Sequence, residues 1–227
     1  GSRAMSGVGL LIAEMTAILK RKMARDYAKG DTRRDAHPKT TGLLRATFTV
    51  AADLPPALQI GLFATPKTYD CWVRTSNSSG KPQADAVPDA RGIAIKLLAP
   101  AGKGKAKEGD TPLGQDFVLL SAPTMPLGTV AMFRDAVFYT IESTALLLGA
   151  KLLLTGKAGA LLDLSALRIR PNSPLDIRYW STTPYLFGKG VAVKYSLRPT
   201  SKHRSPAPAT RGDDYLSEAM QAHLSRH

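Results

Sequence analysis

The segment LLRATFTVAADLP, residues 43–55, alternates apolar and polar side chains with a period of two. Such a period is typical of a strand with one face in a protein core and the other in solvent. The two predicted faces are Leu44, Ala46, Phe48 and Val50 on the apolar side, and Arg45, Thr47 and Thr49 on the polar side. We therefore expect residues 43–55 to form the first strand of a half-buried sheet.

Four further segments have the composition and spacing of strands: TYDCWVRTSN (68–77), ARGIAIKLLAP (90–100), DFVLLSA (116–122) and GVAVKYSLRP (190–199). Helical periodicity instead marks residues 129–165 and residues 212–227. The second of these segments begins near an aspartate suited to a helix cap. A group of strands, a helical insertion, one more strand and a helix predict an α+β fold. The last predicted strand has no following partner, so closing the sheet would need further residues or another subunit.

The start of the chain predicts a helix outside the sheet. Residues 1–7 are interpreted as a tag remnant. Residues 8–30 predict an amphipathic helix, whose apolar stripe consists of Leu11, Met15, Ile18 and the stem of Lys22. We expect this helix to pack on the domain formed by residues 31–227, and contact with a membrane surface through its basic end is the alternative.

The charge balance of the chain favours anionic partners. Its formal net charge is +13, from 31 Lys and Arg against 18 Asp and Glu. Acidic lipid headgroups, nucleic acid or a cofactor with carboxylates would all be attracted. Because the sequence has neither paired Cys/His ligands nor an aromatic-rich RNA-binding strand, we expect no nucleic-acid partner. The single cysteine, Cys71, excludes an internal disulfide and Cys-rich metal sites, and it suits a cytoplasmic compartment.

The most apolar stretch is ALLLGAKLLLTGKAGALLDL, residues 145–164. Two lysines and three glycines interrupt it before about 20 apolar residues accumulate, which argues against a transmembrane span. The stretch predicts either a buried helix pair or a helix at a membrane surface. In the second case the protein would be membrane-peripheral.

Chemical signals concentrate in RRDAHPKTTG, residues 33–42. The chain has no phosphate-binding glycine loop, no His-Glu-x-x-His zinc motif and no Gly-x-Ser-x-Gly elbow. His37 lies three residues after Arg34, and the segment WVRTSN places Arg74 and Ser76 on one face of a strand. Two guanidiniums near an imidazole disfavour a metal cation and favour a carboxylate ligand. His37 is therefore a candidate catalytic base, with a surface histidine in a basic loop as the alternative.

Several motifs resemble, in order, those of the haem catalase family. They are RDAHPKTTGLLRATFTV, YDCWVRTSN, PDARGIAIKLL, QDFVLLSAP and FRDAVFY. More narrowly, the chain resembles small bacterial catalase-related haem proteins, which include peroxidases and relatives of allene oxide synthase, and residues 173–199 and 213–224 extend the resemblance. It implies a catalase-like antiparallel β-barrel with helical insertions, incomplete at the C-terminus of this chain.

The resemblance also implies a cofactor, haem b, and roles for particular residues. His37 would be the distal acid/base, held by a hydrogen bond with Ser76, with Lys39 and Gly42 in register with the family motif. Arg34 and Arg74 would bind the haem propionates. The position of the family's distal asparagine falls near Ser121, where this chain has no asparagine. Ser121 would contact the peroxide instead. The distal aromatic residue would be Phe138 or Tyr139.

Two departures from the family bear on these roles. Ala36 stands where allene oxide synthases have a threonine hydrogen-bonded to the distal histidine. The family's axial tyrosinate lies on a helix near its C-terminus, for which this chain has no counterpart, so the metal ligand is unknown. Tyr215 belongs to a different helix and is not assigned as the ligand.

Three functional hypotheses follow. The first is a haem-dependent peroxidase or catalase-like enzyme that reduces hydrogen peroxide or an organic hydroperoxide, with His37 as its acid/base. The second is a haem-free, inactive catalase-like remnant that acts as a binding or lipid-surface module. The third keeps the haem and converts fatty-acid hydroperoxides. The expected partners are the hydroperoxide, a membrane surface and a second copy of the chain, and the expected location is cytoplasmic or membrane-peripheral.

Overall fold

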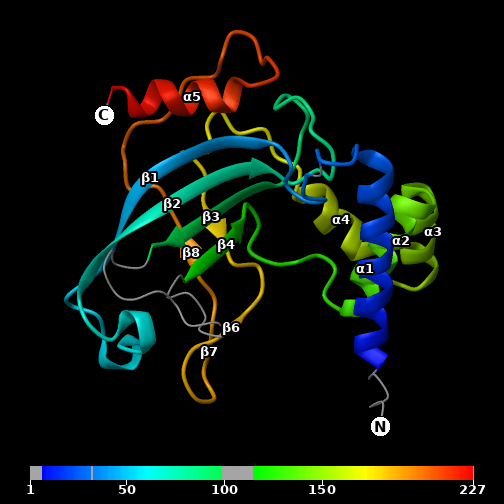
Figure 1. Cartoon of the computed structure of the whole chain (residues 1–227), viewed down its shortest axis with the longest axis horizontal. Helices are drawn as coiled ribbons and strands as arrows, with labels where there is room; N and C mark the ends of the chain where they lie inside the picture. Colours follow the sequence, from blue (N-terminus) through cyan, green and yellow to red (C-terminus); the bar gives the residue numbers. More distant parts are fainter. Residues whose placement is uncertain (1–6, 32, 99–114, 227) are drawn as a thin grey trace.

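The computed structural model describes residues 7–31, 33–98 and 115–226. Its first strand, β1 (Thr40–Val50), sets the faces of the main sheet (Figure 1). Within it the predicted alternation is confirmed: Leu44, Ala46 and Phe48 are half-buried and Val50 is buried, whereas the residues between them are exposed. The strand ends at Val50 rather than at residue 55, because Pro55 and Pro56 lead into a short 3-10 turn, η1 (Pro56–Leu58), which precedes η2 (Gly61–Phe63).

The main sheet has six antiparallel strands in the order β1-β2-β3-β4-β5-β8. The added strands are β2 (Lys67–Asn77), β3 (Arg91–Leu97), β4 (Asp116–Leu120), β5 (Tyr179–Trp180) and β8 (Ser196–Leu197). The sheet curls into a half-barrel (Figure 1). Within the described residues, the edge strands β1 and β8 do not pair, so the sheet is an open half-barrel. The ladder of backbone hydrogen bonds is short at the β8 edge because β5 and β8 contribute only two residues each.

One face of the sheet forms the core. It gathers the buried side chains of Cys71, Ile93, Ile95, Leu97, Phe117, Leu119 and Tyr179. Arg91, Ile93 and Ile95 alternate along β3 and are all buried. Burial raises the pKa of the Cys71 thiol, with a smaller contribution from Asp70, which is the state of an unreactive structural cysteine.

The predicted strand 190–199 is wrong as a single element. It divides into β7 (Ala192–Val193), which pairs with β6 (Tyr185–Leu186) in a separate hairpin, and β8, which pairs with β5. The hairpin turns at Gly188 and Gly190, which both have positive φ angles. Hydrophobic alternation is the same on both sides of the break, so the pattern could not locate it.

Among the described residues, five α-helices flank the sheet. They are α1 (Gly7–Asp26), α2 (Val130–Glu142), α3 (Ala145–Leu154), α4 (Ala158–Ala166) and α5 (Tyr215–Leu224). The helix expected over 8–30 stops at Asp26, and Gly30 adopts a positive φ soon afterwards. The predicted 129–165 helix is three helices, because Thr144 caps α3 and Gly156 turns the chain before α4. None of the described helices is long and apolar enough to cross a bilayer.

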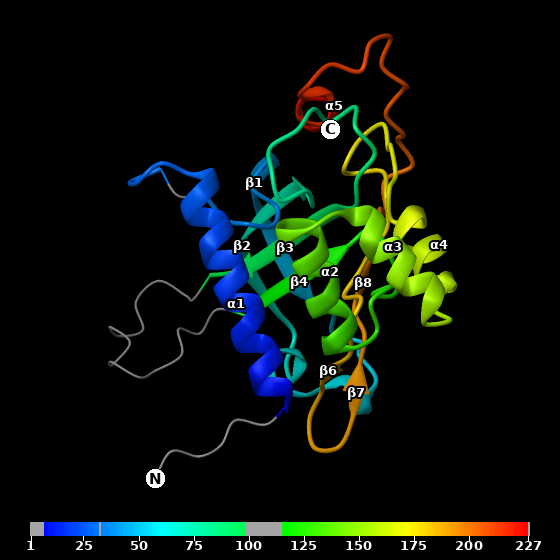
Figure 2. The same cartoon turned by 90° about the vertical axis from the view of Figure 1, so that its right-hand side faces the viewer.

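Helix α1 packs along α2, and both lie to one side of the strands (Figure 2). The predicted stripe is confirmed, since Ile18 and Lys22 are buried and Leu11 and Met15 are half-buried. Ion pairs from Arg21 to Glu142 and from Arg134 to Glu14 border the contact between the two helices. The predicted tag remnant lies outside the described residues except for Gly7, which begins α1.

Candidate functional site

His37 occupies a bend just before β1 and contacts the end of β2. Its φ angle of 58° lies in the left-handed region, which an ordinary residue adopts only when its surroundings hold it there. The imidazole Nδ1 lies 2.9 Å from the Oγ of Ser76, a buried residue. The structure thus brings together the two residues that the sequence predicted as a pair.

The imidazole of His37 rests on the backbone of Gly92. Gly92 lies opposite Ser76 in the ladder between β2 and β3. A Cβ atom at this position would lie 2.6 Å from His37 Cε1 and 2.8 Å from Nδ1, closer than such contacts allow. Sequence reasoning overlooked this glycine, although a glycine inside an apolar strand often marks a close approach.

The guanidinium of Arg74 holds the bend by donating to the backbone of the bend. Its Nη2 donates to the carbonyl oxygen of His37 at 2.6 Å, and its Nε donates to Thr40 Oγ1 at 2.9 Å. On the other side, Lys22 of α1 forms an ion pair with Asp35 at 2.9 Å and donates to the carbonyl oxygen of Gly80. The strand end and the first helix therefore both fix the loop that carries His37.

The environment keeps the His37 ring neutral near pH 7. Burial lowers its pKa, the carboxylate of Asp89 raises it, and the nearby charges of Arg74 and Arg34 lower it. Asp89 is itself held by Ser78, the amide of Ser79 and Gln83. A neutral imidazole with one nitrogen fixed and the other available is the form that a general base requires.

Arg34 and Arg74 form a cationic pair beside the imidazole. Burial lowers the pKa of Arg74, and the positive charge of Arg34 lowers it further. In residues 7–31, 33–98 and 115–226, neither guanidinium forms an ion pair with a carboxylate. Two like charges held together without a described counter-charge favour an anionic ligand, and a pair of carboxylates on a cofactor fits this donor set.

The sheet face next to this pair is partly open and carries both apolar and charged side chains, the charged ones including Arg45, Lys96 and Asp116. Ser76 and Gly92 share their face with both tryptophans, Trp72 and Trp180, because the ladder pairs Gly92 with Leu120 and Leu120 with Trp180. Arg45 and Arg178 stack over the two indoles at 5.1 and 5.2 Å. Leu43 and Val118 on the same face are 60% and 57% exposed. A flat apolar group with acidic substituents fits such a surface.

Ser121 lies beside this site but is tied to the backbone. Its Oγ accepts a hydrogen bond from the amide of Arg91 at 2.9 Å, and its own amide donates to the carbonyl of Arg91. Ser121 thus pairs with the backbone of Arg91, the first residue of β3, which precedes Gly92. The catalytic role predicted for it stays a prediction.

Phe138 and Tyr139 lie on α2 within the helical layer. Their rings meet edge to face, with centroids 5.2 Å apart. Tyr139 packs on the cluster around Leu148 and Leu152, and the Lys151 ammonium lies 5.5 Å from its ring centre. The described contacts of the two rings join α2 to α3 rather than to His37. Their assignment as distal aromatic residues stays a prediction.

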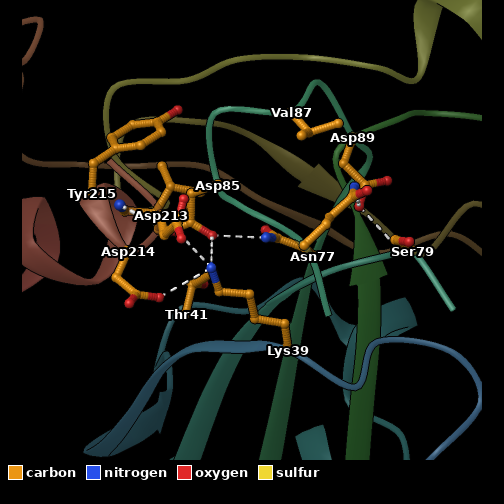
Figure 3. Close-up of polar contacts among 12 residues, drawn as sticks. Lys39, Thr41, Asn77, Ser79, Asp85, Val87, Asp89, Asp213, Asp214 and Tyr215 are labelled. Carbon is orange, nitrogen blue, oxygen red and sulfur yellow. Dashed lines mark hydrogen bonds and ion pairs between the residues drawn. The ribbon is translucent and has the colours of Figure 1, made fainter. Parts of the chain in front are cut away.

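A buried polar network lies behind the bend (Figure 3). At its centre is Asp85, which is fully buried, pairs with Lys39 Nζ at 3.1 Å and accepts a bond from Asn77 Nδ2 at 2.8 Å. Arg91 donates to Asn77 Oδ1 and to the carbonyl oxygens of Asp85 and Val87. The network therefore joins the residues adjacent in sequence to Ser76 and Gly92.

The same network holds helix α5. The amide of Leu216 donates to Asp85 Oδ2 at 3.1 Å, so Asp85 supplies the capping acceptor that the residue preceding α5 does not provide through its side chain. Lys39 forms an ion pair with Asp214 at 3.0 Å and donates to the carbonyl oxygen of Asp213. In the motif around His37, Lys39 therefore serves to dock α5.

Gly42, like Lys39, helps to dock α5. A Cβ atom there would lie 1.7 Å from Met220 Cε, which shows that α5 crosses β1 directly over this glycine. The motif Arg-x-x-His-x-Lys-x-x-Gly thus combines an exposed guanidinium, an imidazole in the site and two positions that seat a distant helix.

A solved structure that matches this chain is a fungal catalase, determined as a crystal structure at 1.9 Å. The match has a TM-score of 0.63 and covers all of this chain but 45% of the catalase chain, at 18% sequence identity. The fold is catalase-like. The likeness concerns the catalase-like fold alone, because the chain spans less than half of that catalase at low identity. No protein-family model matches the sequence, and no curated protein matches it.

Proposed function

We propose that this catalase-like chain binds haem b beside His37 and reacts with a hydroperoxide there. The single observation that carries the proposal is the imidazole of His37, fixed by Ser76 over Gly92 and flanked by two guanidiniums with no described carboxylate partner. Arg34 and Arg74 would bind the haem propionates. The haem, when bound, supplies the iron chemistry that cleaves an O–O bond.

The contribution of the protein is to position a proton acceptor. If Nδ1 of His37 carries its hydrogen and donates it to Ser76 Oγ, Nε2 is left to take a proton from a hydroperoxide and to return it to the leaving oxygen. The lowered pKa keeps Nε2 unprotonated at neutral pH.

The axial ligand of the iron is not assigned to a residue of this chain. In the part of the chain that the structure describes, no three or more His, Cys, Asp or Glu side chains gather in a metal-binding cluster. The residues that would hold the haem are therefore Arg34 and Arg74, through its propionates.

Reconstitution tests the proposal directly. The full chain is titrated with haemin and followed by absorption, and hydroperoxide consumption is then measured for the wild type and for His37→Ala. We expect a saturable Soret band in both proteins and a loss of turnover of about a hundredfold or more in the variant. The absence of a saturable Soret band would contradict haem binding and favour a haem-free binding module. Unchanged turnover in the variant would contradict the role of His37.

The substrate class is a separate question for the same protein. The exposed apolar side chains of Leu43 and Val118 on the sheet face beside the site favour an organic hydroperoxide over hydrogen peroxide. Comparing turnover of hydrogen peroxide, a short alkyl hydroperoxide and a fatty-acid hydroperoxide on the reconstituted chain decides between them. We expect kcat/KM to be greatest for an organic hydroperoxide.

A further inference from the structure

Helix α3 is apolar on two opposite sides, and only one of them is buried. Leu148 and Leu152 pack into the helical layer with Ala160 of α4. Leu146 and Leu154 are 82% and 88% exposed, and Leu147 and Leu153 are more than half exposed. At about 100° per residue these four leucines fall on the side of the helix opposite to the buried pair. A helix that is apolar all round is ordinarily covered on every side.

The exposed face continues into α4. Leu162 of that helix is 72% exposed, and the turn between the helices contains Gly156 with a φ of 70°. Helices α3 and α4 lie together at one outer side of the molecule in Figure 2. The leucine edge, defined as Leu146, Leu147, Leu153, Leu154 and Leu162, is therefore a projecting surface.

The leucine edge is bordered by lysines and by the exposed carboxylate of Asp163, so it is the net charge of the whole chain that favours an anionic partner. Lys157 lies exposed in the turn between the helices, and Lys151 combines a 2.7 Å ion pair to Asp135 with a side chain that is 39% exposed. The whole chain carries a net charge of +13. Lysines beside exposed leucines can keep their ammonium groups among lipid headgroups while their stems follow the apolar surface.

We infer that the helical hairpin of α3 and α4 docks on the surface of an anionic lipid bilayer. The leucine edge would enter the boundary between headgroups and acyl chains, and the basic chain would be attracted to acidic headgroups. A fluid bilayer accommodates a projecting apolar edge without a complementary cavity, which a second protein would have to supply. The inference does not depend on the proposed haem chemistry.

Vesicle co-sedimentation of the full chain tests this. The lipids are phosphatidylcholine with phosphatidylglycerol, and phosphatidylcholine alone. We expect binding to the mixed vesicles, weaker binding to the neutral ones and a decrease at high salt. The double variant Leu153→Ser/Leu154→Ser should lower the partition coefficient about tenfold or more, because it removes two exposed apolar side chains. Leu186→Ser, at a 78% exposed leucine on β6, is the matched control and should bind like the wild type.

Because both substituted leucines are exposed, the double variant should keep the wild-type circular dichroism and melting temperature. Three results would overturn the inference. The first is a failure of the wild type to bind mixed vesicles, and the second is equal binding by the double variant. The third is concentration-dependent self-association of the wild type that the double variant abolishes, which would assign the leucine edge to a second copy of the chain.

Discussion

The carboxylate of Asp85 accepts a hydrogen bond from the amide of Leu216, 131 residues later in the chain, at 3.1 Å. A loop between β2 and β3 thereby caps helix α5, and the same carboxylate pairs with Lys39 in the segment that carries His37. The start of the candidate site and the last helix are joined through one buried side chain. This contact predicts that the site and α5 respond to the same substitutions.

Replacing Asp85 tests the importance of this contact for folding. Asp85→Asn leaves Lys39 without one of its two described carboxylate partners and weakens the cap of α5. Removing one member of a buried ion pair typically costs about 3–5 kcal/mol, so we expect the free energy of unfolding in urea to decrease by about 3 kcal/mol. Asp116→Asn is the matched control, because its ion pair with Lys96 is more than half exposed and contributes less than about 1 kcal/mol. Equal effects of the two substitutions would contradict the prediction.

Adding a methyl group under the imidazole should displace His37. In Gly92→Ala the new Cβ would clash with the ring, and the ring would move toward solvent. Because burial is the main cause of the lowered pKa of His37, we expect this pKa to rise toward 6.5 in an NMR titration. Haemin binding should weaken in the same variant. Gly128→Ala, which adds a methyl group where no atom lies within 4 Å, should leave both unchanged.

The lowered pKa of His37 also predicts how stability depends on pH. A group whose pKa is lower in the folded than in the unfolded protein binds fewer protons when folded. Its stabilisation is complete above the unfolded value of 6.5 and is lost as the pH falls through the folded value. We therefore expect the wild type to lose stability below pH 6.5 more steeply than His37→Gln, as measured by urea unfolding at a series of pH values. Parallel curves would show that His37 is not buried as described.

Removing the charge of Arg34 should affect its neighbours electrostatically. Arg34→Gln eliminates a positive charge that lowers the pKa of both His37 and Arg74. We expect the pKa of His37 to rise in this variant, and the rise to shrink with added salt because Arg34 is exposed. Arg33→Gln removes an equal charge from the adjacent exposed position and should have the smaller effect. A larger effect of Arg33→Gln on the pKa of His37 would show that Arg33, and not Arg34, is the arginine beside the imidazole.

Local periodicity explains which parts of the fold the sequence could predict. The alternation in 43–50 identified the buried face of β1, and the helical spacing of Leu11, Met15 and Ile18 identified the packed side of α1. In the site, the alternation of β2 placed Arg74 and Ser76 on one strand face, whereas the pairing of Ser76 with His37 came from the resemblance to the catalase family. Each of these patterns depends on the geometry of a single element.

Long-range contacts explain what the sequence could not predict. The need for Gly92 arises because a bend 55 residues earlier folds over β3, and the role of Lys39 arises from a helix near the end of the described chain. The division of residues 190–199 between two sheets also depends on the partners of each half. Tertiary packing decides such features, and no local period records it.

Because Lys39 and His37 belong to the same bend, a ligand that immobilises this bend must also favour the docked state of α5. Thermodynamic reciprocity requires that the effect be mutual. Amide hydrogen exchange at Leu216 should then slow when an anion occupies the position beside Arg34 and Arg74, so the first turn of α5 would report on events at the start of β1.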